Sequence, residues 1–156
     1  MSKTCVLILE NLRSVENTAS IFRTAEGLGV AKIFLVGTTP APLDRFGRKR
    51  LDFAKVSLGA EDMLEWDYFN DTPQVINSLK EQGFQIIALE QTNESTKEIK
   101  NFQTEEKFAL IVGNEVDGIS KRAIESSEAV LEIPMNGKKE SLNVSVATGI
   151  ALFMLI

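Results

Sequence analysis

Short runs of consecutive apolar residues alternate with segments of helical periodicity along the whole chain. Five runs are almost entirely apolar and predict buried strands: CVLILE (5–10), KIFLVG (32–37), QIIALE (85–90), FALIVG (108–113) and AVLEIP (129–134). Continuous apolar runs of this length are typical of parallel strands that are covered on both faces. The pattern therefore predicts an α/β fold with a mostly parallel sheet flanked by helices, in a single domain spanning residues 1–156.

Helical periodicity predicts four helices between and after these strands. The first begins with Asn17 as its N-cap and ends near Gly27 or Gly29, and the others cover 73–83, 120–127 and 144–156. A short helical stretch is expected over 57–64, whereas 38–55 and 92–102 are expected to be loops. The last helix is apolar nearly all round, so we expect it to be buried on several sides.

The composition excludes several common chemistries. The chain has 156 residues, a net charge of −5, no histidine and one cysteine. Without histidine there is no imidazole general base, and one cysteine cannot build a zinc site, so no metal is expected. Cys5 lies in an apolar run, which favours a buried thiol over a nucleophile. No signal peptide or membrane-spanning run is visible, so we expect a soluble, cytoplasmic protein.

Positive charge is concentrated in one segment, although the chain as a whole is acidic. The stretch RFGRKRLDFAK (45–55) contains five of the seventeen basic residues. A solvated loop and a phosphate-binding patch explain this cluster equally well, and the sequence leaves both open.

Three unusually polar loops follow predicted strands. Their sequences are NLRSVENTAS (11–20), GNEVDGIS (113–120) and MNGKKESLNVS (135–145). Ligands of open α/β sheets bind at the carboxyl ends of strands, so these loops predict a functional site. In the third loop, Asn143 is expected to cap the last helix, with Ser141 on the same turn.

The three loops, in this order, resemble the motifs of the SpoU-type (TrmH-like) RNA 2′-O-methyltransferases of the SPOUT superfamily. The matching stretches are N-x₅-RTA-x-G, GNEVDG and IPMNGKKESLNVSVA, and the resemblance extends over nearly the whole chain. It implies a deep C-terminal trefoil knot, S-adenosyl-L-methionine as cofactor, a homodimer, and methylation of a ribose 2′-hydroxyl in RNA. We expect tRNA as the substrate, with rRNA as the alternative.

The resemblance also implies residue roles. Arg23 would donate hydrogen bonds to the developing alkoxide or an adjacent phosphate, and Glu115 would hold Arg23 or Asn143 in place. The implied catalytic residues are Arg23, Asn17, Glu115, Ser141 and Asn143, and those implied to bind cofactor are Leu89, Gly113, Ile133, Met135 and Leu142. The residues expected to bind RNA are Arg13, Arg45, Arg48, Lys49 and Arg50.

Two other functions remain open from the sequence. One is a non-catalytic RNA-binding or assembly protein that retains the knotted fold. The other is a flavodoxin-like α/β domain that binds a small anion, which predicts no affinity for S-adenosylmethionine.

Overall fold

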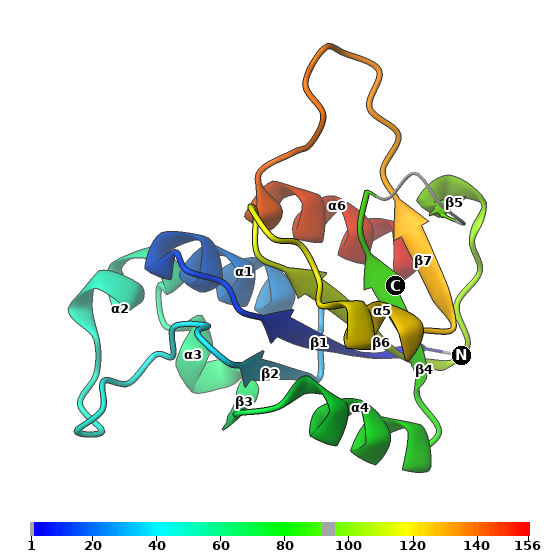
Figure 1. The fold of residues 1–156 in the computed structure, drawn as a ribbon. Helices are drawn as coiled ribbons and strands as arrows, with labels where there is room; N and C mark the ends of the chain where they lie inside the picture. The colour runs from blue at the N-terminus through cyan, green and yellow to red at the C-terminus, as the bar shows by residue number, and fades with distance from the viewer. Residues whose placement is uncertain (1, 92–95) are drawn as a thin grey trace.

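The strands form one parallel sheet in the computed structural model, which describes residues 2–91 and 96–156 (Figure 1). Within these residues the sheet has seven strands in the order β3-β2-β1-β6-β4-β7-β5, and every neighbouring pair is parallel. Their bounds are β1 Thr4–Glu10, β2 Lys32–Val36, β3 Glu65–Phe69, β4 Gln85–Leu89, β5 Lys97–Glu98, β6 Lys107–Gly113 and β7 Ala129–Glu132. The predicted mostly parallel α/β fold is confirmed.

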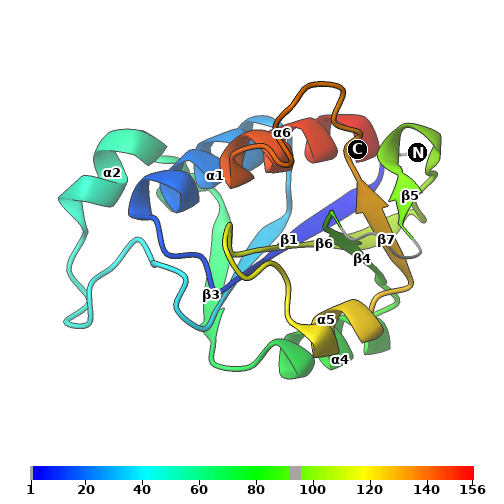
Figure 2. The same cartoon turned by 45° about the horizontal axis from the view of Figure 1, so that its top comes forward.

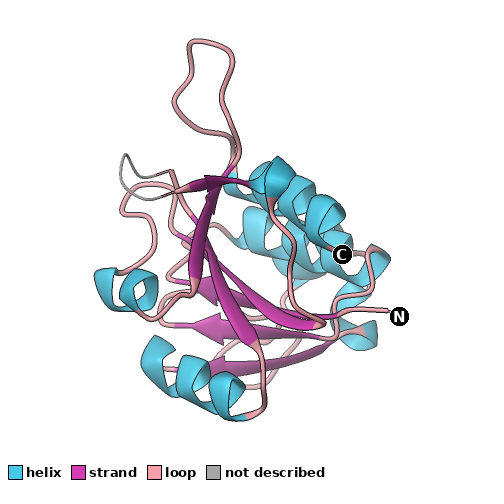
Figure 3. Cartoon of the chain, turned by 90° about the vertical axis from the view of Figure 1, so that its right-hand side faces the viewer, coloured by secondary structure: helices cyan, strands magenta, loops and turns pink. Residues whose placement is uncertain are grey.

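Helices cover both faces of the sheet (Figures 2 and 3). One face carries α1 (Val15–Gly27), α2 (Leu51–Ser57), α3 (Ala60–Met63) and α6 (Val144–Leu155). The opposite face carries α4 (Thr72–Glu81) and α5 (Lys121–Glu125). A 3₁₀ turn, η1, spans Ile99–Asn101, and its Ile99 packs in the core of the first face. Two separate apolar cores result, one between each helical layer and the sheet.

Strand β1 shows why the apolar runs are continuous. Leu7 and Leu9 pack in the core beneath α1 and α6, whereas Val6 and Ile8 pack in the core beneath α4 and α5. Successive side chains of a strand point to opposite faces, so a strand covered on both sides needs apolar residues at every position.

The structure corrects several local predictions. Ser14, not Asn17, caps α1, because the Ser14 hydroxyl accepts the backbone N–H of Asn17 at 3.0 Å. The predicted loop 38–55 ends early, since α2 begins at Leu51. Strand β3 was not predicted; it is an exposed edge strand, and its sequence EWDYF lacks a continuous apolar run.

The predicted loop 92–102 lies partly outside the described residues, over 92–95. Its remainder contains the short strand β5 and the turn η1. Strand β5 has only two residues, which is too short to leave a periodic pattern in the sequence.

Helix α6 is less enclosed than its sequence predicts. Thr148, Ala151 and Leu152 are fully buried against the body of the protein, but a second face is open. Val146, Ile150 and Phe153, spaced four and three residues apart on one side of the helix, are 51%, 37% and 76% exposed. An apolar helix therefore presents an uncovered apolar stripe.

Family resemblance predicts a trefoil knot around α6, and the knot stays a prediction. The loop 133–143 that joins β7 to α6 projects from the body of the molecule (Figure 1).

No helix in the described part of the chain combines the length and apolarity that crossing a membrane requires.

Cys5 is expected to be unreactive in the folded protein. The thiol lies on β1 at 2% exposure, and burial raises its pKa to about 12. At pH 8 the thiolate that attacks alkylating reagents is therefore absent from the native state. Mass spectrometry after iodoacetamide treatment should detect alkylation only in denaturant, and stoichiometric labelling of the native protein would contradict the burial.

Candidate active site

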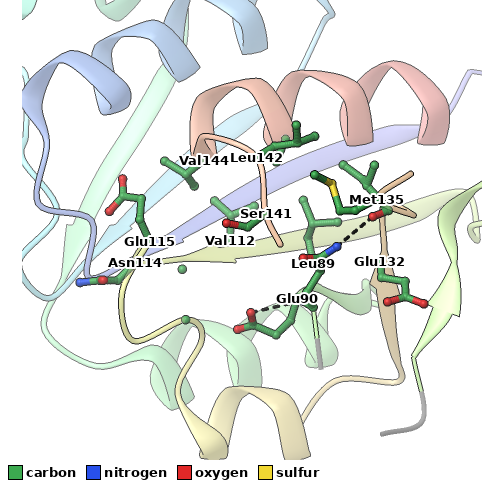
Figure 4. A pocket seen from close by; sticks show the side chains of 15 residues that line it. Leu89, Glu90, Val112, Asn114, Glu115, Glu132, Met135, Ser141, Leu142 and Val144 are labelled. Atoms are coloured by element: carbon green, nitrogen blue, oxygen red, sulfur yellow. Dashed lines mark hydrogen bonds between the residues drawn. The ribbon is translucent and has the colours of Figure 1, made fainter. Parts of the chain in front are cut away.

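One pocket lies at the carboxyl ends of the central strands, between the second and third polar loops and the end of β4 (Figure 4). Asn17, from the first polar segment, bonds to Glu115 in its wall. The pocket has an empty volume of about 660 Å³, part of which is open to solvent. Its walls come from the ends of β4 and β6, the segments after β6 and β7, and the start of α6.

All five residues predicted to bind a cofactor line this pocket. They come from three separate segments of the chain: Leu89, Gly113, Ile133, Met135 and Leu142. Two residues predicted to be catalytic, Glu115 and Ser141, line it as well. Gly118, which like Gly113 was expected to let the backbone approach the cofactor, also lines the pocket. The remaining lining residues were not predicted: Glu90, Gln91, Val112, Asn114, Glu132, Val144 and Ala147.

Asn17, Glu115 and Asn143 form a chain of side-chain hydrogen bonds across the three loops. Asn17 Nδ2 donates to Glu115 Oε1 at 2.9 Å, and Asn143 Nδ2 donates to Asn17 Oδ1 at 3.3 Å. Glu115 thus contacts Asn17, whereas the expected partners were Arg23 or Asn143. Because Ser14 caps α1, the Asn17 side chain is free to connect the other two.

Asn143 also holds its own helix, as the sequence predicts. Its Oδ1 accepts the backbone N–H of Ser145 at 2.9 Å, which makes Asn143 the N-cap of α6. The same side chain therefore fixes the start of α6 and faces the first loop through Asn17. The Asn17 amide, which bonds to both Glu115 and Asn143, thus connects segments far apart in sequence.

The turn that carries Glu115 is held by Asn114, which is 4% exposed. Asn114 Oδ1 accepts from the backbone N–H of Val116 at 2.7 Å and of Asp117 at 3.1 Å. Its Nδ2 donates to the backbone carbonyl of Asn11 at 3.0 Å. Asn114 thus stabilises the turn and attaches it to the end of β1, next to the first loop.

Two carboxylates anchor the far end of the same loop. Glu10, 2% exposed at the end of β1, accepts from the Ser120 backbone N–H at 2.6 Å and the Ser120 hydroxyl at 2.9 Å. Glu90, at the end of β4, accepts from the backbone N–H of Ile119 at 2.7 Å. Nothing in the sequence around Glu10 or Glu90 signals these long-range partners.

The loop after β6 folds back tightly on itself at two glycines. A Cβ on Gly113 would lie 2.6 Å from the backbone carbonyl carbon of Gly118. Gly118 has φ +70°, a conformation that favours glycine, and a Cβ there would lie 2.4 Å from Glu90 Oε2. Both glycines line the pocket, so the pocket wall depends on close backbone packing.

Arg23 lies outside this pocket. It is exposed on α1, six residues after Asn17, and does not contribute to the pocket lining of its own chain. The pocket does contain carboxylates, but the described residues include no group of three or more His, Cys, Asp or Glu side chains that could hold a metal ion.

Most residues predicted to bind RNA form ion pairs on the surface. Their partners are Asp117 for Arg13, Asp44 for Arg48, Asp62 for Lys49 and Asp52 for Arg50, with N–O distances of 3.1, 3.0, 2.9 and 2.9 Å. Exposed pairs such as these contribute little to stability because solvent screens them, so the cations can exchange carboxylates for phosphates. Arg45 forms no ion pair with any described residue and instead lies against Phe46.

The parallel sheet and the pocket at its carboxyl strand ends define an α/β protein with a candidate small-molecule site. Comparison with known proteins makes the assignment specific. Residues 4–153 match the model of the SpoU rRNA Methylase family, and the chain belongs to that family.

Individual relatives agree with this assignment. An uncharacterized tRNA/rRNA methyltransferase of Borreliella burgdorferi is 34% identical over 95% of this chain and 61% of its own length. The tRNA (guanosine(18)-2′-O)-methyltransferase of Aquifex aeolicus is 28% identical over 97% and 68%. The AdoMet-bound rRNA methyltransferase of Sinorhizobium meliloti superposes with a TM-score of 0.87 at 26% identity, over 99% of this chain and 56% of that one. The chain thus spans about three fifths of the relatives it matches.

Proposed function

We propose that the protein transfers a methyl group from S-adenosyl-L-methionine to the 2′-hydroxyl of a ribose in RNA. The observation that carries this proposal is that three separate segments of the chain, at the ends of β4, β6 and β7, converge on one pocket. Every residue that the family resemblance assigns to the cofactor lines that pocket, and the Asn17–Glu115–Asn143 chain connects the three loops.

The chemistry of the pocket fits this cofactor. Apolar side chains such as Leu89, Ile133 and Leu142 can enclose an adenine ring, and backbone groups near Gly113 are open to polar contacts. Glu90 and Glu132 add negative charge to the lining, which favours a cationic ligand over an anionic one. A small-anion site, the flavodoxin-like alternative, fits this lining poorly.

The protein's own residues would orient the alcohol and stabilise developing negative charge. S-adenosylmethionine supplies an electrophilic methyl group on a sulfonium. Arg23 would donate hydrogen bonds to the ribose oxygen as its proton passes to the neighbouring phosphate, or to that phosphate itself, because a guanidinium is a hydrogen-bond donor only. Ser141 and Asn143 would position the ribose on the rigid start of α6.

A homodimer would bring Arg23 to a pocket. Arg23 does not line the pocket of its own chain, and the family resemblance implies that it serves the pocket of the other subunit. The exposed stripe of Val146, Ile150 and Phe153 on α6 is a surface that a second copy of the chain can cover. We therefore place the dimer contact on α6.

Phe153→Asp is expected to convert the dimer to a monomer and to reduce methyl transfer with it. Phe153 is 76% exposed in the single chain, so the charge should disturb the contact and leave the fold intact. Analytical ultracentrifugation measures the mass, and Met63→Asp, at a residue 75% exposed on α3, is the matched control. A Phe153→Asp variant that remains dimeric would place the interface elsewhere.

RNA is the proposed substrate, with tRNA favoured over rRNA, and the cytoplasm the proposed location. Arg13, Arg45, Arg48, Lys49 and Arg50 would contact phosphates, so RNA affinity should fall steeply as salt concentration rises. A flat salt dependence, measured by filter binding, would remove these residues from the interface.

The direct test is methyl transfer from labelled S-adenosylmethionine to unmodified total tRNA and, separately, to rRNA. Digestion to nucleosides then identifies the product. Label in a 2′-O-methyl nucleoside is the expected result. RNA and cofactor binding without label in either pool would instead support a non-catalytic RNA-binding protein of the same fold.

A further inference from the structure

The basic segment after β2 forms a closed, ordered hairpin. Leu43 and Lys49 form an antiparallel bridge. Asp44 N–H donates to the Arg48 carbonyl at 2.8 Å, and Gly47, at φ +78°, closes the turn through its N–H to the Asp44 carbonyl at 2.9 Å. The tip, residues 44–48, is therefore presented in one conformation, and this lowers the entropy cost of binding through it.

The Asp44 carboxylate holds the tip from inside. It accepts from the backbone N–H of Phe46 at 2.8 Å, the backbone N–H of Arg48 at 2.9 Å and Arg48 Nε at 3.0 Å. These hydrogen bonds, chiefly that from the Arg48 backbone, lower the pKa of Asp44 below its usual value. The carboxylate is thus ionised at neutral pH and keeps the tip folded there.

Phe46 stands at the apex with two guanidinium groups against its ring. The residue is 67% exposed, and the Cζ atoms of Arg45 and Arg48 lie 4.9 and 5.0 Å from the ring centroid. An exposed phenylalanine gains nothing from burial in the protein's own core. Here it is instead combined with cations that can contact phosphates and whose planar groups can themselves stack on a base.

The hairpin lies at the same end of the sheet as the candidate active site. It leaves the carboxyl end of β2, which is the neighbour of β1 (Figure 1, cyan). Its base is bonded to the first polar loop: Leu12 N–H donates to Thr39 Oγ1 at 3.0 Å, and Thr38 Oγ1 donates to the Leu12 carbonyl at 3.2 Å. Leu12 is followed by Arg13, and Asn17 lies in the first turn of α1 just beyond, so the hairpin and the Asn17 network share one support.

We propose that Phe46, flanked by Arg45 and Arg48, is a stacking site for an unpaired base of the RNA substrate. An exposed aromatic ring offers a π-face to any base, and the arginines offer hydrogen bonds to the adjoining phosphates. A duplex hides its base faces, so the site selects single-stranded or looped nucleotides. The inference rests on the proposed function for the identity of the ligand as RNA.

The test compares Phe46→Ala and Phe46→Trp with the unaltered protein for binding to unmodified tRNA and to a fully paired RNA duplex. Stacking on one aromatic residue contributes about 1–3 kcal/mol, so F46A should weaken tRNA binding roughly 5- to 150-fold and duplex binding little. F46W should retain tRNA affinity, and the fluorescence of its added indole should be quenched by the stacked base. Met63→Ala, also at an exposed apolar residue, is the control.

The salt dependence of tRNA affinity distinguishes base stacking on Phe46 from phosphate contacts made by the arginines. F46A should leave the slope of affinity against salt unchanged, whereas Arg45→Ala should reduce it by about one phosphate contact. Unchanged tRNA affinity in F46A, or an equal loss for tRNA and duplex, would overturn the stacking site. These are binding measurements and do not depend on catalysis. If F46A weakens tRNA binding but the unaltered protein transfers no methyl group, the stacking site is supported and the catalytic proposal fails. If the unaltered protein transfers methyl groups but F46A binds tRNA as tightly as the unaltered protein does, the catalytic proposal stands and the stacking site fails.

Discussion

Arg23→Ala is expected to lower the rate of methyl transfer by about 100- to 1000-fold, the usual cost of removing one donor to a developing oxyanion. Affinity for S-adenosylmethionine should be nearly unchanged, because the proposed contacts of Arg23 are with the ribose oxygen or the neighbouring phosphate and not with the cofactor. Single-turnover kinetics with labelled cofactor measures the first quantity, and isothermal titration calorimetry measures the second.

Two further variants make the Arg23 result specific. Arg23→Lys keeps the positive charge but loses the planar donor fork, so it should recover only part of the rate. Arg122→Ala removes an exposed arginine from α5, on the opposite face of the sheet, and should behave as the unaltered protein. Full activity in the Arg23→Ala variant would refute the proposed role of this arginine.

Gly113→Ala is expected to weaken cofactor binding and to destabilise the fold. Its Cβ would lie 2.6 Å from the backbone of Gly118, and backbone atoms cannot swing away as the end of a flexible side chain can. Forcing the loop apart should lower the free energy of unfolding by about 1–3 kcal/mol, as overpacking does. Affinity for S-adenosylmethionine should fall at least about tenfold, since 1.4 kcal/mol of lost binding free energy corresponds to that factor.

The matched control for this substitution is Gly27→Ala at the end of α1, where an added Cβ meets no atom within 4 Å. Its stability should be unchanged or raised by up to about 1 kcal/mol, because alanine favours helix over glycine. Thermal unfolding and calorimetry on both variants check the pair. Wild-type cofactor affinity in the Gly113→Ala protein would show that the loop opens without cost.

The fold class was predictable because its signal is local. Strands covered on both faces must be apolar at successive positions, so CVLILE and FALIVG identify β1 and β6 without any knowledge of their neighbours. Edge strands escape this rule. Strand β3 is partly exposed and mixes polar with aromatic residues, and nothing in EWDYF distinguishes it from a loop until β2 is placed beside it.

The pocket lining was predictable in part for a different reason. Polar loops after apolar strands must meet at one edge of a parallel sheet; the ordered motifs named Gly113 and Met135 among its residues, and Leu89 was named at the end of QIIALE. The predicted N-cap of α1, Asn17, was wrong. Ser14 and Asn17 are both good capping residues, and the local sequence does not show which of them caps the helix. The choice of Ser14 leaves the Asn17 side chain free to bond Glu115 and Asn143.

The sequence by itself determined which segments are buried, which loops are polar and which side chains can do chemistry, because burial and helix or strand periodicity are set by near neighbours in the chain. Only the tertiary structure decided which of those side chains meet. The bond from Glu10 to Ser120 spans 110 residues, and the guanidinium groups stack on Phe46 only because a hairpin closes around Asp44. Such contacts depend on where the sheet brings distant segments, and this depends on the packing of all the strands and helices at once.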